Sequence, residues 1–302
     1  MEENQIRFLR VCESLAAIHD AFILAPTRKE LPDLESNPWS GLKDFLGYAF
    51  ERQGKADDYP AIAVWLAEKY SQERKPITQQ TGKEFWEEFE RELKDHGHTK
   101  GVNARLNPLA PKGTKYELKR KGETHKPNTR ERSIFELIEG EGFTNISITT
   151  WAADSIKKSP KKAREKLAHI NGISNKIASL YLRDIALLKG IEPVAEERYC
   201  LQPIDVWLRY LGAEIWGVQK SDEDYSKLYA DLTSHNLNPE KINMGIWFLS
   251  VQVCGSSWFS VKKAMCDSKY RNCLLDKLKS RYVSAADAVK INPLFNRNQS
   301  EG

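Results

Sequence analysis

The stretch that decides the fold runs from residue 169 to residue 205, and its first part reads HINGISNKIASLYLRDIALLK over residues 169–189. A lysine-rich segment at 160–168 precedes it and has the composition of a helix. Beyond Gly172, apolar residues recur every three or four positions from Ser174 onward, which is helical spacing. The pattern predicts a helix, a tight turn and a second helix.

The turn centred on Gly172 suits a phosphate ligand. Glycine tolerates left-handed backbone and allows a ligand to approach the main chain closely. The amides at the start of the following helix form an anion site. We therefore expect Gly172, Ile173, Ser174 and Asn175 to hold a DNA backbone.

Two ionisable residues could give this scaffold chemistry. Lys176 lies in the first turn of the second helix, where the helix dipole mildly disfavours a cation, so helix stability does not explain it. Asp205 follows Pro203, a residue that tends to end one element and begin the next. An amine and a carboxylate together can attack the sugar carbon that bears a base and offset the charge that develops there.

The arrangement resembles the helix-hairpin-helix DNA glycosylases, in which a Gly-x-x-x-Lys hairpin is followed by a Pro-x-Asp segment. Here the matching residues are Gly172, Lys176, Pro203 and Asp205. The resemblance implies an all-α, two-lobed fold. It also implies a partly desolvated Lys176 that acts as nucleophile, with Asp205 as its carboxylate partner.

A longer Lys-to-Asp separation, 29 residues here, is similar to the archaeal 8-oxoguanine DNA glycosylase type. The segment around Trp86 and the helix that carries Trp247 also resemble that type. The likeness spans roughly residues 37–255 and implies that these two rings sandwich a flipped base. On an amphipathic helix each would otherwise be a core residue.

Two departures from that type fall in the implied base pocket. Asn243 stands where the family has an acid, and Trp39 stands where it has a glutamine. These changes remove groups that would recognise 8-oxoguanine, so the excised base is expected to differ. Two substrates stay open: an oxidised purine, as in base excision repair, or a modified phage cytosine such as glucosylated hydroxymethylcytosine, as in antiviral defence.

Ordinary structural roles are the alternative to catalysis for both residues of the candidate catalytic pair. Lys176 could be an ordinary exposed helix lysine, and Asp205 could simply cap the helix that follows it, which is compatible with catalysis. The rival function is a non-catalytic helix-hairpin-helix protein that only binds DNA. Such modules are shorter and need no Pro-x-Asp segment.

Positive charge is concentrated in two segments of a chain whose net charge is +4. Residues 100–132 hold ten Lys or Arg against three Glu, and residues 157–166 hold six against one. Such segregation favours a polyanionic partner. We expect Lys157, Lys158, Lys161 and Lys162 to contact DNA phosphates, although a solvated helix face explains many charge runs.

Composition bounds the remaining possibilities. The chain has 302 residues, 40% hydrophobic and 29% charged, and no apolar run approaches the ~20 residues of a membrane span. Five unevenly spaced cysteines indicate reduced thiols, and the three near the C-terminus lack iron–sulfur spacing. We expect a cytoplasmic monomer that acts on double-stranded DNA without membrane, metal or cofactor.

Helical patterns recur throughout, and no run of alternating strands is found. We expect three parts: an N-terminal helical lobe at 1–130 that ends in a basic loop at 97–130, a catalytic lobe at 131–212, and C-terminal helices at 213–302. The tail from 292 has the composition of a disordered segment. Proline residues at 26, 32 and 38 are expected to break the first helices.

Overall fold

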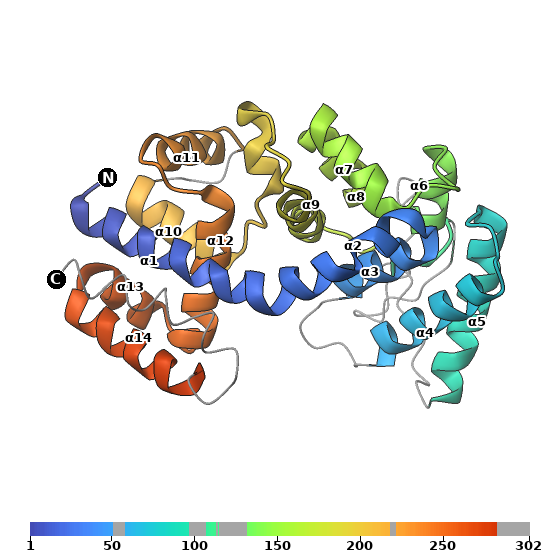
Figure 1. The fold of residues 1–302 in the computed structure, drawn as a ribbon, viewed down its shortest axis with the longest axis horizontal. Coiled ribbons are helices and arrows are strands. Elements are labelled where there is room, and N and C mark those ends of the chain that lie inside the picture. The colour runs from blue at the N-terminus through green and yellow to red at the C-terminus, as the bar shows by residue number, and fades with distance from the viewer. Residues whose placement is uncertain (51–57, 97–106, 113, 115–131, 218–221, 283–302) are drawn as a thin grey trace, which may run out of the picture. The chain divides into compact units, whose positions relative to one another are not determined.

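The computed structural model describes residues 1–50, 58–96, 107–112, 114, 132–217 and 222–282, and every named element in them is a helix (Figure 1). The predicted all-α class is confirmed for this part of the chain. The sole β-type pairing described there is an isolated bridge between Arg132 and Ile170. The expected basic loop lies largely outside the described residues, as does the tail from residue 292.

The chain divides into two compact units. The terminal unit comprises residues 1–28 and 204–302, and the central unit comprises residues 29–203. These limits differ from the expected boundaries at 130 and 212. The difference arises because the first helix packs against helices near the C-terminus, and such a long-range contact leaves no trace in local sequence patterns.

The central unit is built from seven α-helices and one 3₁₀ helix within its described residues, preceded by a helix that spans the division. In order these are α2 (Ala25–Ser36), α3 (Pro38–Phe50), α4 (Asp58–Gln72), α5 (Gln79–Asp95), α6 (Ile134–Gly140), α7 (Ile148–Lys158), α8 (Pro160–Ala168), α9 (Asn175–Lys189) and η3 (Ala195–Leu201). Helices α7, α8 and α9 pack on one another, and α3 contacts both α7 and α9. This packing supports the segment that begins α9.

The helix α5 shows how the sequence pattern becomes core. Its N-cap Thr78 accepts a hydrogen bond from the amide of Thr81, which satisfies one of the first-turn donors. Phe85, Phe89 and Leu93, spaced by four residues, are fully buried. Each such side chain contributes roughly 1.5–3 kcal/mol through burial. The helix is therefore amphipathic, with one apolar face in the core.

The terminal unit begins with α1 and resumes after the central unit. Its elements are α1 (Glu3–His19), the π-helix η1 (Asp20–Leu24), α10 (Val206–Trp216), α11 (Asp222–Ser234), α12 (Pro239–Phe248), the π-helix η4 (Leu249–Val253), α13 (Trp258–Cys266) and α14 (Ser268–Tyr282). The most extensive packing between two helices is that of α1 against α12 (Figure 1). There a Cβ on Gly245 would lie 1.6 Å from the carbonyl oxygen of Cys12, so only glycine permits this approach.

The expected breaks at Pro26 and Pro32 are wrong, because both residues lie within α2. Pro26 occupies the first turn of that helix, where its missing amide is tolerated. The π-helix η1 immediately precedes it, and the amide of Ala25 bonds to the carbonyl of Asp20, five residues back. This wider turn joins α1 to α2 without a loop.

Two separate helices end the described part of the chain, because α13 ends at Cys266 and α14 begins at Ser268. Asp267 separates them in extended conformation, and its side chain accepts a hydrogen bond from the amide of Tyr270 at 3.0 Å. An aspartate at such a position caps the second helix.

Within the described residues, no single helix has both the length and the hydropathy of a membrane span. One bent pair, Pro239–Val253 with Trp258–Cys266, meets the criterion when its two parts are taken together.

Candidate nucleic-acid site

The turn between α8 and α9 has the conformation that its glycine suggested. Gly172 has φ +72°, in the left-handed region that favours glycine. The neighbouring Ile173 is buried, and its amide donates to the carbonyl of Ile170 at 3.0 Å. The predicted order of helix, tight turn and helix is confirmed at the expected residues.

Hydrogen bonds of Asn171 and Arg132 hold the turn in place. The amide of Asn171 donates to the carbonyl of Arg132 at 2.8 Å, and the amide of Arg132 donates to the carbonyl of His169 at 3.1 Å. The side-chain amide of Asn171 donates to the carbonyl of Ala110 at 2.7 Å. These three bonds tie both sides of the turn to a neighbouring segment, so the turn is held in one geometry.

The start of α9 presents main-chain donors. Ser174 is the N-cap, and its hydroxyl accepts from the amide of Ile177 at 3.4 Å. Asn175 and Lys176 follow as the first two helical residues, whose amides no intrahelical acceptor can reach. Ser174, Asn175 and Lys176 are all exposed. The geometry therefore suits an anion such as a phosphate.

Lys176 is exposed in the free chain. The expectation of a partly desolvated amine is therefore not met by the chain alone. Its position in the first turn of α9 leaves the side chain in solvent, whereas the apolar face of the same helix, including Tyr181 and Ile185, is buried. Any desolvation of this amine must come from a bound ligand.

The four lysines expected to contact phosphates lie at the end of α7 and the start of α8. Lys157, Lys158, Lys161 and Lys162 are all exposed. Lys157 is 3.8 Å from Asp154, a distance at which an exposed pair contributes little. The end of α7 and the start of α8 thus offer a cationic edge, which is separated from the turn that contains Gly172 by the length of α8.

Glu197 was not singled out from the sequence. Its carboxylate accepts from the Ser159 hydroxyl at 2.7 Å and from the Lys161 amide at 3.0 Å, at the N-terminus of α8. A carboxylate there complements the helix dipole. Glu197 therefore already occupies the N-terminus of α8, so of these two helices it is α9 whose N-terminus is open to a ligand.

Asp205 is the N-cap of α10 in the terminal unit. Its Oδ1 accepts from the amide of Leu208 at 2.9 Å, and the side chain is half-buried. Capping fixes the carboxylate at a helix N-terminus, where a negative charge is stabilised. The alternative role foreseen for Asp205, that of a helix cap, is confirmed.

Trp39 and Trp86, the central-unit members of the implied base pocket, lie in the hydrophobic core, each 5% exposed. The Trp39 ring stacks on Phe85 at 6.0 Å, and its Nε1 donates to the carbonyl of Lys75 at 2.7 Å. The Trp86 ring stacks at 6.1 Å on Phe89. Both rings are thus engaged in core packing in this structure.

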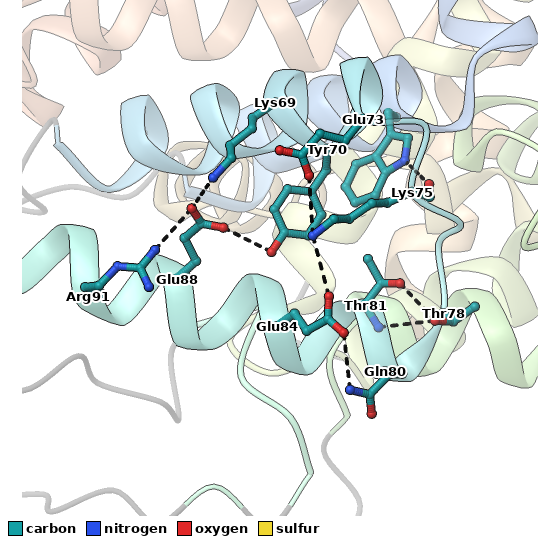
Figure 2. A network of polar contacts seen from close by, with 11 residues as sticks. Lys69, Tyr70, Glu73, Lys75, Thr78, Gln80, Thr81, Glu84, Glu88 and Arg91 are labelled. Atoms are coloured by element: carbon teal, nitrogen blue, oxygen red, sulfur yellow. Dashed lines mark hydrogen bonds and ion pairs between the residues drawn. The ribbon is translucent and has the colours of Figure 1, made fainter.

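A polar network borders this aromatic core (Figure 2). Glu88 on α5 accepts from Lys69 and from the Tyr70 hydroxyl, and its Oε1 is 3.2 Å from Arg91. Burial acts to raise the pKa of Glu88, but the hydrogen bonds from Lys69 and Tyr70 and the nearby cations lower it overall. The network joins α4 to α5, which is a structural task.

The two terminal-unit residues of the implied pocket differ from each other in exposure. Asn243 on α12 is buried, whereas Trp247, one turn later on the same helix, is 44% exposed. Trp247 is therefore the one tryptophan of the implied pocket with a ring open to a ligand in this structure. Helix α12 contacts α10, the helix that Asp205 caps.

The second half of α9 carries a buried charged cluster that sequence reasoning missed. Arg183 and Asp184 are buried and paired, with the Arg183 Nε donating to Asp184 Oδ1 at 2.9 Å. The Tyr48 hydroxyl donates to Asp184 Oδ2 at 3.1 Å. Adjacent charges inside the apolar run of residues 177–188 were the available signal.

Among the described residues, no three His, Cys, Asp or Glu side chains lie close enough together to hold a metal ion. Of the three cysteines near the C-terminus, Cys254 is buried, whereas Cys266 and Cys273 are exposed.

Comparisons of this chain with protein-family models, with curated proteins and with solved structures return no match.

Proposed function

We propose that the chain is a two-lobed helix-hairpin-helix DNA glycosylase that excises a damaged or modified base. One observation carries the proposal: a left-handed Gly172 turn leads into a capped helix whose first turn exposes Lys176. The Pro203–Asp205 segment then supplies the carboxylate of Asp205, which is held in place because it accepts a hydrogen bond from the Leu208 amide. A simple DNA-binding module requires the turn but needs no Pro-x-Asp segment after it.

In the proposed reaction the Gly172–Asn175 turn and the cationic edge hold DNA phosphates while one nucleotide leaves the stack. The Lys176 Nζ forms a bond to the sugar C1′ as the bond from C1′ to the base breaks. The base departs with the electron pair of that bond. Asp205 accepts the proton from Nζ and offsets the positive charge that develops on the sugar.

In the covalent product the C1′–O4′ bond of the sugar breaks as the Nζ lone pair forms a double bond to C1′, and O4′ takes the proton that Asp205 had accepted. The resulting Schiff base permits strand cleavage. Lys176 must be neutral to attack, and it is exposed in the free chain. Closure of DNA over the helix start removes water and disfavours the charged amine. The exposed ring of Trp247 is available to stack on the base.

Base release from three DNAs tests the proposal and its substrate. Mass spectrometry follows free base from duplexes that contain 8-oxoguanine or uracil, and from phage DNA with glucosylated hydroxymethylcytosine. We expect release of a modified base and formation of abasic sites. Asn243 stands where the resembling family has an acid, which favours a base other than 8-oxoguanine, and an oxidised purine and a modified phage cytosine both stay open.

Two results would contradict parts of this proposal. Efficient release of 8-oxoguanine with none from phage DNA excludes the shifted specificity but keeps the glycosylase. Release of no base from any of the three, with tight DNA binding intact, favours the non-catalytic DNA-binding protein.

A further inference from the structure

Exposed large apolar side chains are unusually prominent at the start of α10 and of α13. Phe259 is 76% exposed, the highest value among the large hydrophobic residues that the structure describes. Tyr210 is 45% exposed, and Val206, one turn earlier on α10, is half-exposed. Contiguous apolar groups of this kind mark interaction sites more often than chance exposure does.

Two contacts align these helices. The rings of Tyr210 and Trp258 lie 4.9 Å apart, and Lys262 pairs with Glu214 at 2.6 Å. Each second contact is four residues further along its own helix. The two contacts therefore bring the first turn of α13 next to the Tyr210 ring of α10. We name Val206, Tyr210, Trp258 and Phe259 the α10–α13 aromatic surface.

The rings are held firmly from behind. Trp207 is buried and meets the Tyr210 ring edge-on at 6.1 Å. A rigid aromatic ring loses little conformational entropy when a ligand covers it, so the surface is suited to stacking.

Charge indicates the kind of ligand. Lys262 and Glu214 neutralise each other, which leaves Arg209 and Lys263 as exposed cations on the two helices, with the carboxylate of Asp205 at the start of α10. Exposed rings among cations match a ligand with flat faces and negative charge. Unpaired nucleotides have both, whereas a duplex hides its base faces. An apolar protein partner would have no need of the cations.

The surface is also near Asp205 along the chain. Tyr210 is five residues beyond Asp205 on the same helix, which corresponds to a rise of about 7.5 Å along the axis and a turn of about 140° around it. A strand at Asp205 therefore has to follow the side of α10 to meet the Tyr210 ring.

We propose that the α10–α13 aromatic surface binds unpaired nucleotides of a DNA strand, with at least one base stacked on Phe259 or Tyr210. The proposal deepens the proposed function, on which it rests for the nature of the ligand. It makes the substrate a duplex that is opened beyond the target nucleotide, or a single strand.

Fluorescence anisotropy with an unmodified single-stranded oligonucleotide and with its duplex tests this. The variants are Phe259→Ala, Phe259→Leu and Phe259→Trp, and Trp65→Ala is the matched control, because Trp65 is an exposed ring on α4 of the central unit. We expect alanine and leucine to weaken single-strand binding about tenfold and tryptophan to retain it, because stacking requires an aromatic face. Duplex affinity and the Trp65→Ala protein should change little.

Three results would overturn the proposal. The first is unchanged single-strand affinity in Phe259→Ala. The second is wild-type affinity in Phe259→Leu, which would indicate apolar contact without stacking. The third is loss of binding to phosphatidylglycerol vesicles in Phe259→Ala while oligonucleotide affinity is unchanged, which would assign the surface to lipid. The oligonucleotide carries no modified base, so a protein that excises nothing can still pass this test.

Discussion

Asp44 on α3 carries a carboxyl oxygen, Oδ2, that is buried and has no hydrogen-bond partner among the described residues. Burial, followed by the negative charges of Asp184 and Glu30, raises the pKa of Asp44 to about 6. Because the folded-state pKa lies above the unfolded-state value, Asp44 favours folding only when it is protonated. That contribution is complete below the unfolded-state pKa of ~4 and is lost as the pH rises through about 6.

Asp44→Asn should therefore increase the free energy of unfolding on the order of 2 kcal/mol above about pH 7, with a gain that vanishes toward about pH 4. Urea denaturation across this pH range measures the difference between variant and wild type. Asp154→Asn, an exposed carboxylate on α7, is the control and should show no such trend. A difference that stays constant with pH, or that grows toward acid, would contradict the assignment.

Asp205→Asn separates the charge of this residue from its capping role. Asparagine caps a helix about as well as aspartate, so the fold of α10 should be kept. We expect base excision to fall by several orders of magnitude with DNA affinity nearly unchanged, because the carboxylate acts on the transition state. Single-turnover kinetics and binding titrations measure the two quantities.

Asp267→Asn is the matched control for that experiment. Asp267 also receives a backbone amide at the start of a helix in the terminal unit. It should excise at the wild-type rate. Equal losses in both variants would mean that the effect of Asp205 is structural.

At the scale of elements, the two ends of α9 make a natural comparison. Gly172 precedes the helix with φ +72°, and Gly190 ends it with φ +61°. An alanine at either position costs about 1 kcal/mol, because the left-handed region is unfavourable to a side chain. Only Gly172 belongs to the proposed phosphate site.

Gly172→Ala should therefore weaken duplex binding beyond its effect on stability, whereas Gly190→Ala should lose stability alone. A Cβ at Gly190 would meet no atom within 4 Å, which makes it a clean reference for strain. Thermal melting and DNA titration of the two variants supply the comparison. Equal DNA affinities would remove the turn from the binding surface.

The elements themselves were largely predictable, because most have local signals. Apolar spacing and the serine before residue 175 place α9, and the proline at residue 160 places the start of α8. The join from α1 to α2 was not predictable. It depends on a π-turn, whose shifted hydrogen bond has no composition of its own.

At the scale of the whole molecule, charge segregation predicts how salt affects binding. Replacement of Lys157, Lys158, Lys161 and Lys162 by glutamine should weaken binding to all sequences alike. Each lost phosphate contact should flatten the slope of log K against log salt by about 0.9. A control replaces four other exposed lysines, at positions 29, 83, 94 and 241. An unchanged slope in the first variant would place the DNA track elsewhere.

The candidate site was only partly predictable. The turn, Lys176 and the cap at Asp205 follow from local sequence, and they lie where the pattern placed them. The burial of Trp39 and Trp86 depends on which face of α3 and α5 meets the core, which involves partners far along the chain. The buried pair of Arg183 and Asp184 was missed for the same reason, because its partner Tyr48 lies on α3.

The central claim is that Lys176 forms a covalent bond to the sugar, and trapping with borohydride tests it most directly. The substrate is the DNA from which a base is released. Reduction during turnover should give a stable protein–DNA adduct with wild-type protein and with the Lys189→Gln control, in which an exposed lysine at the other end of α9 is replaced. Lys176→Gln should give none. Base excision at a near wild-type rate by Lys176→Gln, or an adduct that persists in it, would contradict the account.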